Sequence, residues 1–141
     1  MNSLIYIVED DPLVAEWVEE LITKEFGSGM EARLIGTHSS FLKEFKNIAN
    51  DPPGCIIMDF MLQWSDEATS DGPKKLNSFL TAGIECYRML MNDPRTKGIP
   101  ILIYTVLDKA DIRDLPRHAP YLRKDAPDEK LVDWVRAALN P

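Results

Sequence analysis

Short, nearly unbroken apolar runs recur along the chain, each bounded by polar or turn-forming residues. The clearest runs are 4–8 (LIYIV), 55–58 (CIIM) and 101–104 (ILIY), with a weaker run at 31–36 and a brief one at 121–123. Runs of this length are typical of strands covered on both faces of a parallel sheet. The 31–36 run is more polar than the others, so we expect it near an edge of the sheet.

Between these runs, apolar residues recur at the three- and four-residue spacing of amphipathic helices. The pattern predicts a helix from Pro12 to the turn at Gly27, and a second one to about Ala49 that Ser39 or Ser40 caps. Two further helices are predicted over about 77–91 and 127–139. Trp17 and Leu42 fall on the apolar faces of the first two helices, so we expect both to be buried.

Strands and helices alternate along the whole chain. This alternation predicts an α/β fold with a parallel sheet, right-handed crossovers and helices on both faces. A length of 141 residues suits one domain with a single core, and we expect residues 1–141 to form it without an output domain. Residues 63–82 interrupt the alternation as a long insertion, and 107–118, which Pro116 divides, predict at most a short fourth helix.

Composition narrows the classes of function. The net charge is −7, so we do not expect direct nucleic-acid binding, which needs a basic face. No window reaches the length of a membrane span, and the N-terminus lacks the basic segment of a signal peptide, which favours a cytoplasmic location. Cys55 and Cys86 lie in apolar stretches without metal-binding spacing, and we interpret them as core residues.

Polar residues that could carry chemistry stand at the ends of the predicted strands. Glu9 and Asp10 follow the first strand, Asp59 follows the third, Thr105 closes the fourth and Lys124 follows the fifth. The carboxyl ends of parallel strands share one rim, where open α/β sheets bind ligands. Three close carboxylates repel one another and favour a hard cation such as Mg²⁺. The set suits phosphoryl transfer to Asp59 as nucleophile, with Lys124 and Thr105 contacting phosphoryl oxygens.

With these residues the chain resembles the receiver domain of a two-component response regulator. The resemblance rests on segments 7–12 (IVEDDP), 56–59 (IIMD), 83–85 (GIE), 100–105 (PILIYT) and 121–124 (YLRK). It implies a flavodoxin-like, doubly wound sheet of five strands in the order 2-1-3-4-5. It also implies a phosphoacceptor signalling protein that assists its own phosphorylation and dephosphorylation, and not an enzyme.

The resemblance assigns a role to each residue. Asp59 would take a phosphoryl group from a histidine of a sensor kinase or of a phosphotransfer protein. Thr105 and Tyr121 would form a switch pair that alters the surface offered to an unknown downstream protein, and a homodimer stays open. The ligands of Mg²⁺, or of Mn²⁺ in its place, would be Glu9, Asp10, Asp59 and the backbone carbonyl of Met61.

Four features depart from the family pattern. Leu62 and Gln63 stand where a Met-Pro pair is usual. Gly83 comes 24 positions after Asp59, which implies a long insertion after the third strand. Asp125 replaces the usual proline after the active-site lysine, so we do not expect a cis peptide bond there. The short fourth helix puts in doubt the family's common dimer and output face.

Two other classes of protein stay open on the residues alone. An aspartate-nucleophile phosphatase of the haloacid dehalogenase type would need a second Asp two residues after the nucleophile, where Met61 stands. A degenerate receiver that serves only as a phosphorylation-independent binding module would lack the acceptor, an acidic residue or the lysine, and all of these are present.

Four further residues have interpretations of their own. We interpret Asp11 as a residue at the N-terminus of a helix rather than as a metal ligand. The resemblance implies that Met61 and Leu107 flank the path of an attacking water. Because both are apolar and cannot orient water, we expect a slowly hydrolysing aspartyl phosphate. Trp64 either packs the insertion onto the domain or presents a surface to a partner, and the sequence leaves both open.

Overall fold

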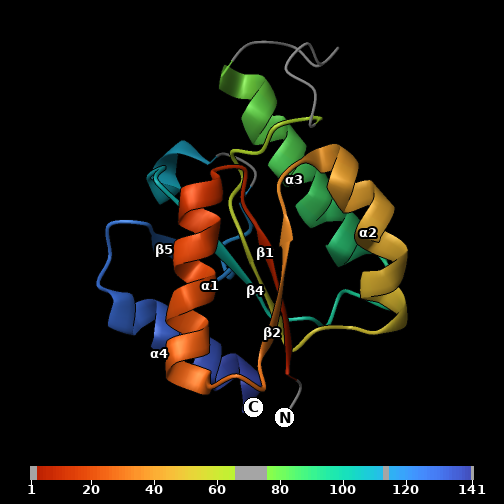
Figure 1. The fold of residues 1–141 in the computed structure, drawn as a ribbon. Helices are drawn as coiled ribbons and strands as arrows, with labels where there is room; N and C mark the ends of the chain where they lie inside the picture. Colours follow the sequence, from red (N-terminus) through yellow and green to blue (C-terminus); the bar gives the residue numbers. More distant parts are fainter. Residues whose placement is uncertain (1–2, 66–75, 113–114, 141) are drawn as a thin grey trace.

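Five parallel strands form the centre of the molecule (Figure 1). The computed structural model describes residues 3–65, 76–112 and 115–140. The sheet order is β2-β1-β3-β4-β5, and every neighbouring pair is parallel. This order confirms the expected flavodoxin-like topology. The strands are β1 (Leu4–Val8), β2 (Glu31–Ile35), β3 (Cys55–Met58), β4 (Ile101–Thr105) and β5 (Tyr121–Arg123).

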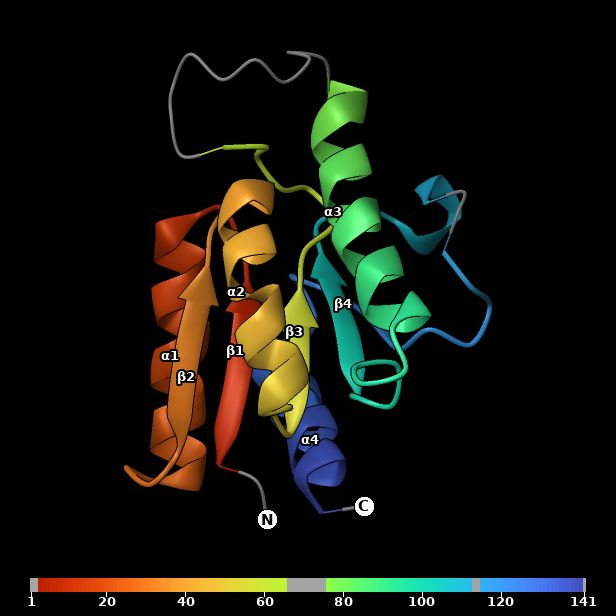
Figure 2. The same cartoon turned by 90° about the vertical axis from the view of Figure 1, so that its right-hand side faces the viewer.

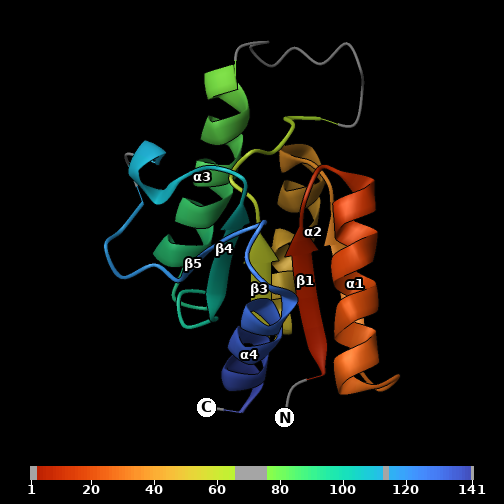
Figure 3. The same cartoon turned by 90° about the vertical axis from the view of Figure 1, so that its left-hand side faces the viewer.

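Four α-helices cover the two faces of this sheet within the described residues. Figure 2 shows α2 and α3 in front of the strands, and Figure 3 shows α1 and α4 on the opposite face. No helix in the described part of the chain is long and apolar enough to cross a membrane. The helices are α1 (Pro12–Phe26), α2 (His38–Asn50), α3 (Leu76–Asn92) and α4 (Asp128–Leu139).

The apolar runs form strands because both of their faces are buried. In β1, Tyr6 packs into the core layer below α2 and α3, while Ile5 and Ile7 pack into the layer below α1 and α4. Full burial of one such aliphatic side chain stabilises the fold by about 1.5–3 kcal/mol. Cys55 and Cys86 are buried and free, as expected of core residues. The polar run at β2 forms an edge of the sheet, also as expected.

The N-termini of α1 and α2 are capped in different ways. Asp11 caps α1 as expected, and its carboxylate accepts a hydrogen bond from the Leu13 amide at 3.0 Å. The prediction that Ser39 or Ser40 caps α2 was wrong. Thr37 is the cap, and its hydroxyl accepts from the Ser40 amide at 3.0 Å. Helix α2 begins earlier than expected because carbonyl groups from beyond β3 accept its first amides.

The region between β4 and β5 contains only a short 3₁₀ turn, η1 (Lys109–Asp111), among its described residues. The expected shortening of the fourth helix is therefore confirmed, and the next α-helix along the chain, α4, follows β5. Residues 66–75 of the insertion lie outside the described residues. In the described part of the chain no peptide bond is cis, which agrees with the expectation for Lys124 and Asp125.

Candidate functional site

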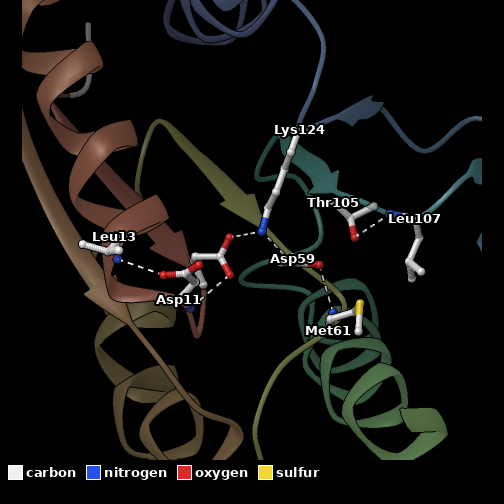
Figure 4. A network of polar contacts seen from close by, with 8 residues as sticks. Asp11, Leu13, Asp59, Met61, Thr105, Leu107 and Lys124 are labelled. Carbon is white, nitrogen blue, oxygen red and sulfur yellow. Dashed lines mark hydrogen bonds and ion pairs between the residues drawn. The ribbon is translucent and has the colours of Figure 1, made fainter.

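The residues expected at the rim follow or close β1, β3, β4 and β5, and Figure 4 shows Asp59, Thr105 and Lys124 close to one another. For Glu9, Asp59 and Lys124, a backbone hydrogen bond to the neighbouring strand extends the pairing by one residue. The Asp59 amide donates to the Val8 carbonyl at 2.9 Å, and the Lys124 amide donates to the Thr105 carbonyl at 2.9 Å. Pairing of the strands therefore brings Asp59 and Lys124 to the same edge of the sheet, although they are far apart in the sequence.

Lys124 bridges two of the carboxylates. Its Nζ donates to Oδ2 of Asp59 at 2.7 Å and also forms an ion pair with Oε1 of Glu9. Both acids are buried, with Glu9 6% and Asp59 3% exposed. Burial alone would lower the pKa of Lys124, but the charges of Asp59 and Glu9, and their hydrogen bonds with it, raise that pKa above its ordinary value. The lysine is therefore held in its charged form.

The acidic residues carry more negative charge than one ammonium can neutralise. Burial raises the pKa of Glu9 to about 7, and the charge of Asp59 adds to this rise while Lys124 opposes it. Burial also raises the pKa of Asp10, although a hydrogen bond with Glu9 acts in the other direction. A raised carboxyl pKa means that the charged form is under-compensated. The site would therefore gain stability from a further cation.

The donor atoms are those that Mg²⁺ prefers. Carboxylate and carbonyl oxygens suit this hard cation, and the strand ends bring together Glu9, Asp10 and Asp59, with Met61 two residues beyond the last of them. Among the described residues, no three His, Cys, Asp or Glu side chains are already arranged as a metal-binding group. The ammonium of Lys124 stands between Glu9 and Asp59 instead. The chemistry of the donors thus fits magnesium, while the carboxylates are bridged by the lysine.

The second oxygen of Asp59 has a partner of its own. Oδ1 accepts a hydrogen bond from the Met61 amide at 2.9 Å. This short turn orients the carboxylate and holds the backbone of Met61 next to it (Figure 4). The carboxylate of Asp11 caps α1, and the Asp11 backbone amide donates to Oε2 of Glu9 at 3.3 Å.

The expected switch pair meets at Leu107. Thr105 is fully buried, and its hydroxyl accepts a hydrogen bond from the Leu107 amide at 3.4 Å. The half-buried Tyr121 packs against the core, and its hydroxyl donates to the Leu107 carbonyl. Thr105 and Tyr121 are thus joined through one backbone unit. Their role as a switch stays a prediction.

Gly83, on α3, lies against the backbone of the residue that follows Asp59. The sequence did not reveal why glycine is needed at this position. A Cβ atom at this position would lie 2.1 Å from the Phe60 carbonyl oxygen and 2.3 Å from the Phe60 Cα. Helix α3 therefore packs directly on the backbone of the residue that follows Asp59. Only glycine permits such a close approach, so the chain can pass from β3 beneath α3 without disturbing the turn at Met61.

The fold and the rim together define an α/β domain with a polar site at the carboxyl ends of its strands. No protein-family model matches the chain, and no curated protein matches it. Solved structures do match. One is a signal receiver domain of a two-component histidine kinase from Clostridium thermocellum, with a TM-score of 0.75, 20% identity and 100% of both chains covered.

Two further solved structures lead to the same class. A response regulator receiver protein from Burkholderia phymatum matches with a TM-score of 0.67 and 24% identity, over 96% of this chain and 94% of its own. The receiver domain of a sensor histidine kinase from Pseudomonas aeruginosa, which has a magnesium ion coordinated in its active-site cleft, matches with a TM-score of 0.68 and 17% identity over 100% of both chains. The chain has the receiver-domain fold of two-component signalling proteins.

Proposed function

We propose that this chain is a phosphoacceptor of a two-component system or phosphorelay, in which Asp59 receives a phosphoryl group from a histidine. The observation that carries the proposal is the buried carboxylate of Asp59 at a strand end, with the Lys124 ammonium 2.7 Å away. A buried carboxylate is unfavourable unless a cation compensates it or a reaction uses it. The compensating lysine, two more acids and a hydroxyl at the same rim favour the reactive role.

The transfer step uses groups that this chain provides. A carboxylate oxygen of Asp59 forms the new P–O bond as the P–N bond of the phosphohistidine breaks, and the histidine nitrogen leaves with the bonding electrons. Lys124 supplies a point charge to the phosphoryl oxygens. The Thr105 hydroxyl accepts one hydrogen bond from Leu107, and such a hydroxyl can still donate its own proton to a phosphoryl oxygen.

Magnesium belongs to this proposal, with manganese as a substitute. Bound Mg²⁺ would neutralise charge on the phosphoryl oxygens. The raised pKa values of Glu9 and Asp10 support a cation here, and the magnesium in the cleft of the Pseudomonas receiver domain supports the choice of metal. The residues that would hold it are Glu9, Asp10, Asp59 and the backbone carbonyl of Met61.

The partners follow from the same chemistry. The phosphoryl donor would be a sensor histidine kinase or a histidine phosphotransfer protein, and we propose a cytoplasmic location on this basis. The chain would act as a phosphoacceptor that assists its own phosphorylation, and not as an enzyme for a separate substrate. Thr105 and Tyr121, joined through Leu107, would pass the change at Asp59 to the surface that meets a downstream protein.

Phosphorylation of the purified chain tests the proposal directly. We expect acetyl phosphate with Mg²⁺ to add the mass of one phosphoryl group, and Asp59→Asn to abolish this addition. Asp133→Asn is a matched control, because Asp133 is an exposed aspartate of α4. Beryllofluoride with Mg²⁺ should change the spectrum of the wild type and leave that of Asp59→Asn unaltered. A phosphoryl group that persists in Asp59→Asn would contradict the assignment.

A degenerate receiver that binds a partner without phosphorylation is the second candidate. One observation favours it: the Lys124 ammonium bridges Glu9 and Asp59, so these two carboxylates are partly compensated without a metal ion. If this reading is correct, neither acetyl phosphate nor beryllofluoride will produce an Asp59-dependent change at any Mg²⁺ concentration. The same experiment therefore separates the two functions.

A further inference from the structure

Strand β2 forms an outer edge of the sheet, and part of its backbone faces away from β1 (Figure 2). The Glu31 amide donates to the Ser3 carbonyl at 2.7 Å, which fixes the residues of β2 that bond to β1. In a parallel ladder, alternate residues of a strand bond to the same neighbour. The N–H and C=O groups of Ala32 and Leu34 therefore point outward, where no other strand of the described chain lies.

A groove lies between this edge and helix α2. Its volume is about 460 Å³, and its polar lining consists of Tyr6, Arg33, Ser40, Lys43 and Glu44. Arg33 lies on the face of β2 toward α2, since its Nη1 donates to the Tyr6 hydroxyl at 3.2 Å and that hydroxyl donates to Oε2 of Glu44 at 3.3 Å. Tyr6 is fully buried, so packing of the core holds this part of the groove in place. The acidic residues of the strand-end site lie outside the lining, so the groove is a separate feature.

The hydrogen-bond donors that remain available in this groove belong to cations. Arg33 donates through Nε to Oε1 of Glu31 at 3.1 Å and through Nη1 to Tyr6, which leaves Nη2. The exposed Lys43 forms no ion pair with any carboxylate in the described part of the chain. The carboxylate of Glu44 already accepts from Tyr6. Two cationic donors at one groove suit a carboxylate from another molecule, because charge-assisted hydrogen bonds are the stronger kind.

A second copy of this chain fits the edge poorly. An antiparallel, two-fold symmetric pair of β2 strands satisfies all the outward groups only when Ala32 of each copy faces Leu34 of the other. Arg33 then lies directly opposite Arg33 of the other copy, and like charges in this position destabilise a strand pair. Charged side chains on edge strands commonly prevent self-pairing in this way. The edge therefore disfavours its own copy and favours a strand that places an acidic residue opposite Arg33.

We propose that the β2 edge and the groove form a docking site for an extended segment of a partner protein, in which an acidic residue lies between two apolar residues. The segment adds a strand to the sheet through the outward groups of Ala32 and Leu34. Side chains alternate between the faces of a strand, so the acidic residue opposite Arg33 enters the groove and reaches Arg33 and Lys43. Its apolar neighbours lie on the other face beside Leu34, which is 45% exposed and becomes more buried in the complex.

Amide hydrogen exchange measured by NMR tests the docking site, with the acetylated and amidated peptide Thr-Val-Glu-Val-Thr as the probe. We expect the Ala32 and Leu34 amides to exchange fast in the chain alone. With the peptide at about 5 mM they should exchange about fivefold more slowly, which corresponds to a Kd of about 1 mM. The same peptide with Lys in place of Glu should protect neither amide. The Arg123 amide, on β5 at the opposite edge of the sheet, is the internal control and should not change.

Variants of the groove test the role of its cations. Arg33→Gln and Lys43→Gln should each weaken binding of the Glu peptide by about twofold to fivefold, as expected of partly exposed ion pairs. Lys46→Gln, at an exposed position of α2 outside the lining, is the matched control.

The proposal is overturned if the Ala32 and Leu34 amides are already protected in the chain alone, because this chain or a second copy of it would then cover the edge. It is also overturned if the Glu peptide gives no protection, if the Lys peptide protects equally, or if neither Arg33→Gln nor Lys43→Gln weakens binding more than Lys46→Gln does. None of these outcomes depends on phosphorylation of Asp59.

Discussion

Glu9 should make the stability of this protein depend on pH, and its replacement tests the electrostatics of the site. Glu9 is 6% exposed, and its burial raises the pKa to about 7 from an ordinary 4.5. The folded state therefore holds this proton to a higher pH than the unfolded state does. The stability contributed by the protonated group is complete below pH 4.5 and is lost as the pH rises through about 7.

The magnitude follows from the two pKa values. One pKa unit corresponds to about 1.4 kcal/mol, so the full effect is about 3 kcal/mol when the pH is well above both values. About 2.5 kcal/mol of it develops between about pH 5 and about pH 8. Gln keeps an oxygen that can accept from the Asp11 amide, and Lys124 keeps Asp59 as its partner. Glu9→Gln should therefore gain stability over the wild type by about this amount across the interval.

Chemical denaturation of both proteins over this pH range measures the effect. The matched control is Glu16→Gln, because Glu16 is an exposed glutamate of α1, and its difference from the wild type should not vary with pH. Mg²⁺ gives a second readout, since a ligand that binds only the folded state stabilises it by mass action. We expect Mg²⁺ to stabilise the wild type at high pH and Glu9→Gln less.

A difference between Glu9→Gln and the wild type that stays constant with pH would refute the argument, because it would mean that burial does not raise the pKa of Glu9. A pH-dependent difference without any effect of Mg²⁺ would support the electrostatics of the site and contradict the proposed cation ligand.

Further predictions concern the backbone around the site and the lifetime of the phosphorylated form. Gly83→Ala should lower the free energy of unfolding by about 1–3 kcal/mol or more, since the new Cβ would clash with the Phe60 backbone. Chemical denaturation measures this change. Gly29→Ala is the control, because a Cβ at Gly29 would meet open space. Thr37→Ala should cost about 1 kcal/mol through loss of the α2 cap, measured as a lower Tm. The aspartyl phosphate should persist for many minutes, and Met61→Asn should shorten its half-life; a wild-type half-life of seconds with Mg²⁺ would contradict this.

The sequence predicted the sheet and its rim because both depend on local pattern. An apolar run such as 55–58 is buried on both faces wherever it lies in the sheet, and residues that follow parallel strands share one edge. Asp59, Thr105 and Lys124 could therefore be placed together before their distances were known. The insertion after β3 and the short fourth helix were equally visible, since both are interruptions of a regular alternation.

The contacts that cross between elements could not be predicted in this way. Trp17 and Leu42 lie at helical positions typical of a core face, yet they are 37% and 48% exposed. How much of a helix face is buried depends on the elements that pack against it, and the local pattern does not show these. Thr37 replaces the expected serines as the α2 cap because carbonyls of Gln63 and Trp64 accept the next amides. A local pattern carries no information about an acceptor that arrives from another part of the chain.

The sequence alone therefore determined which residues meet at the strand ends, since strand order and strand direction suffice for that. Only the tertiary structure decided how they share their charge and their neighbours. It places Lys124 between Glu9 and Asp59, and it joins Thr105 to Tyr121 through Leu107. These relations depend on distances of a few ångströms between side chains of different elements, and such distances are set by packing in three dimensions.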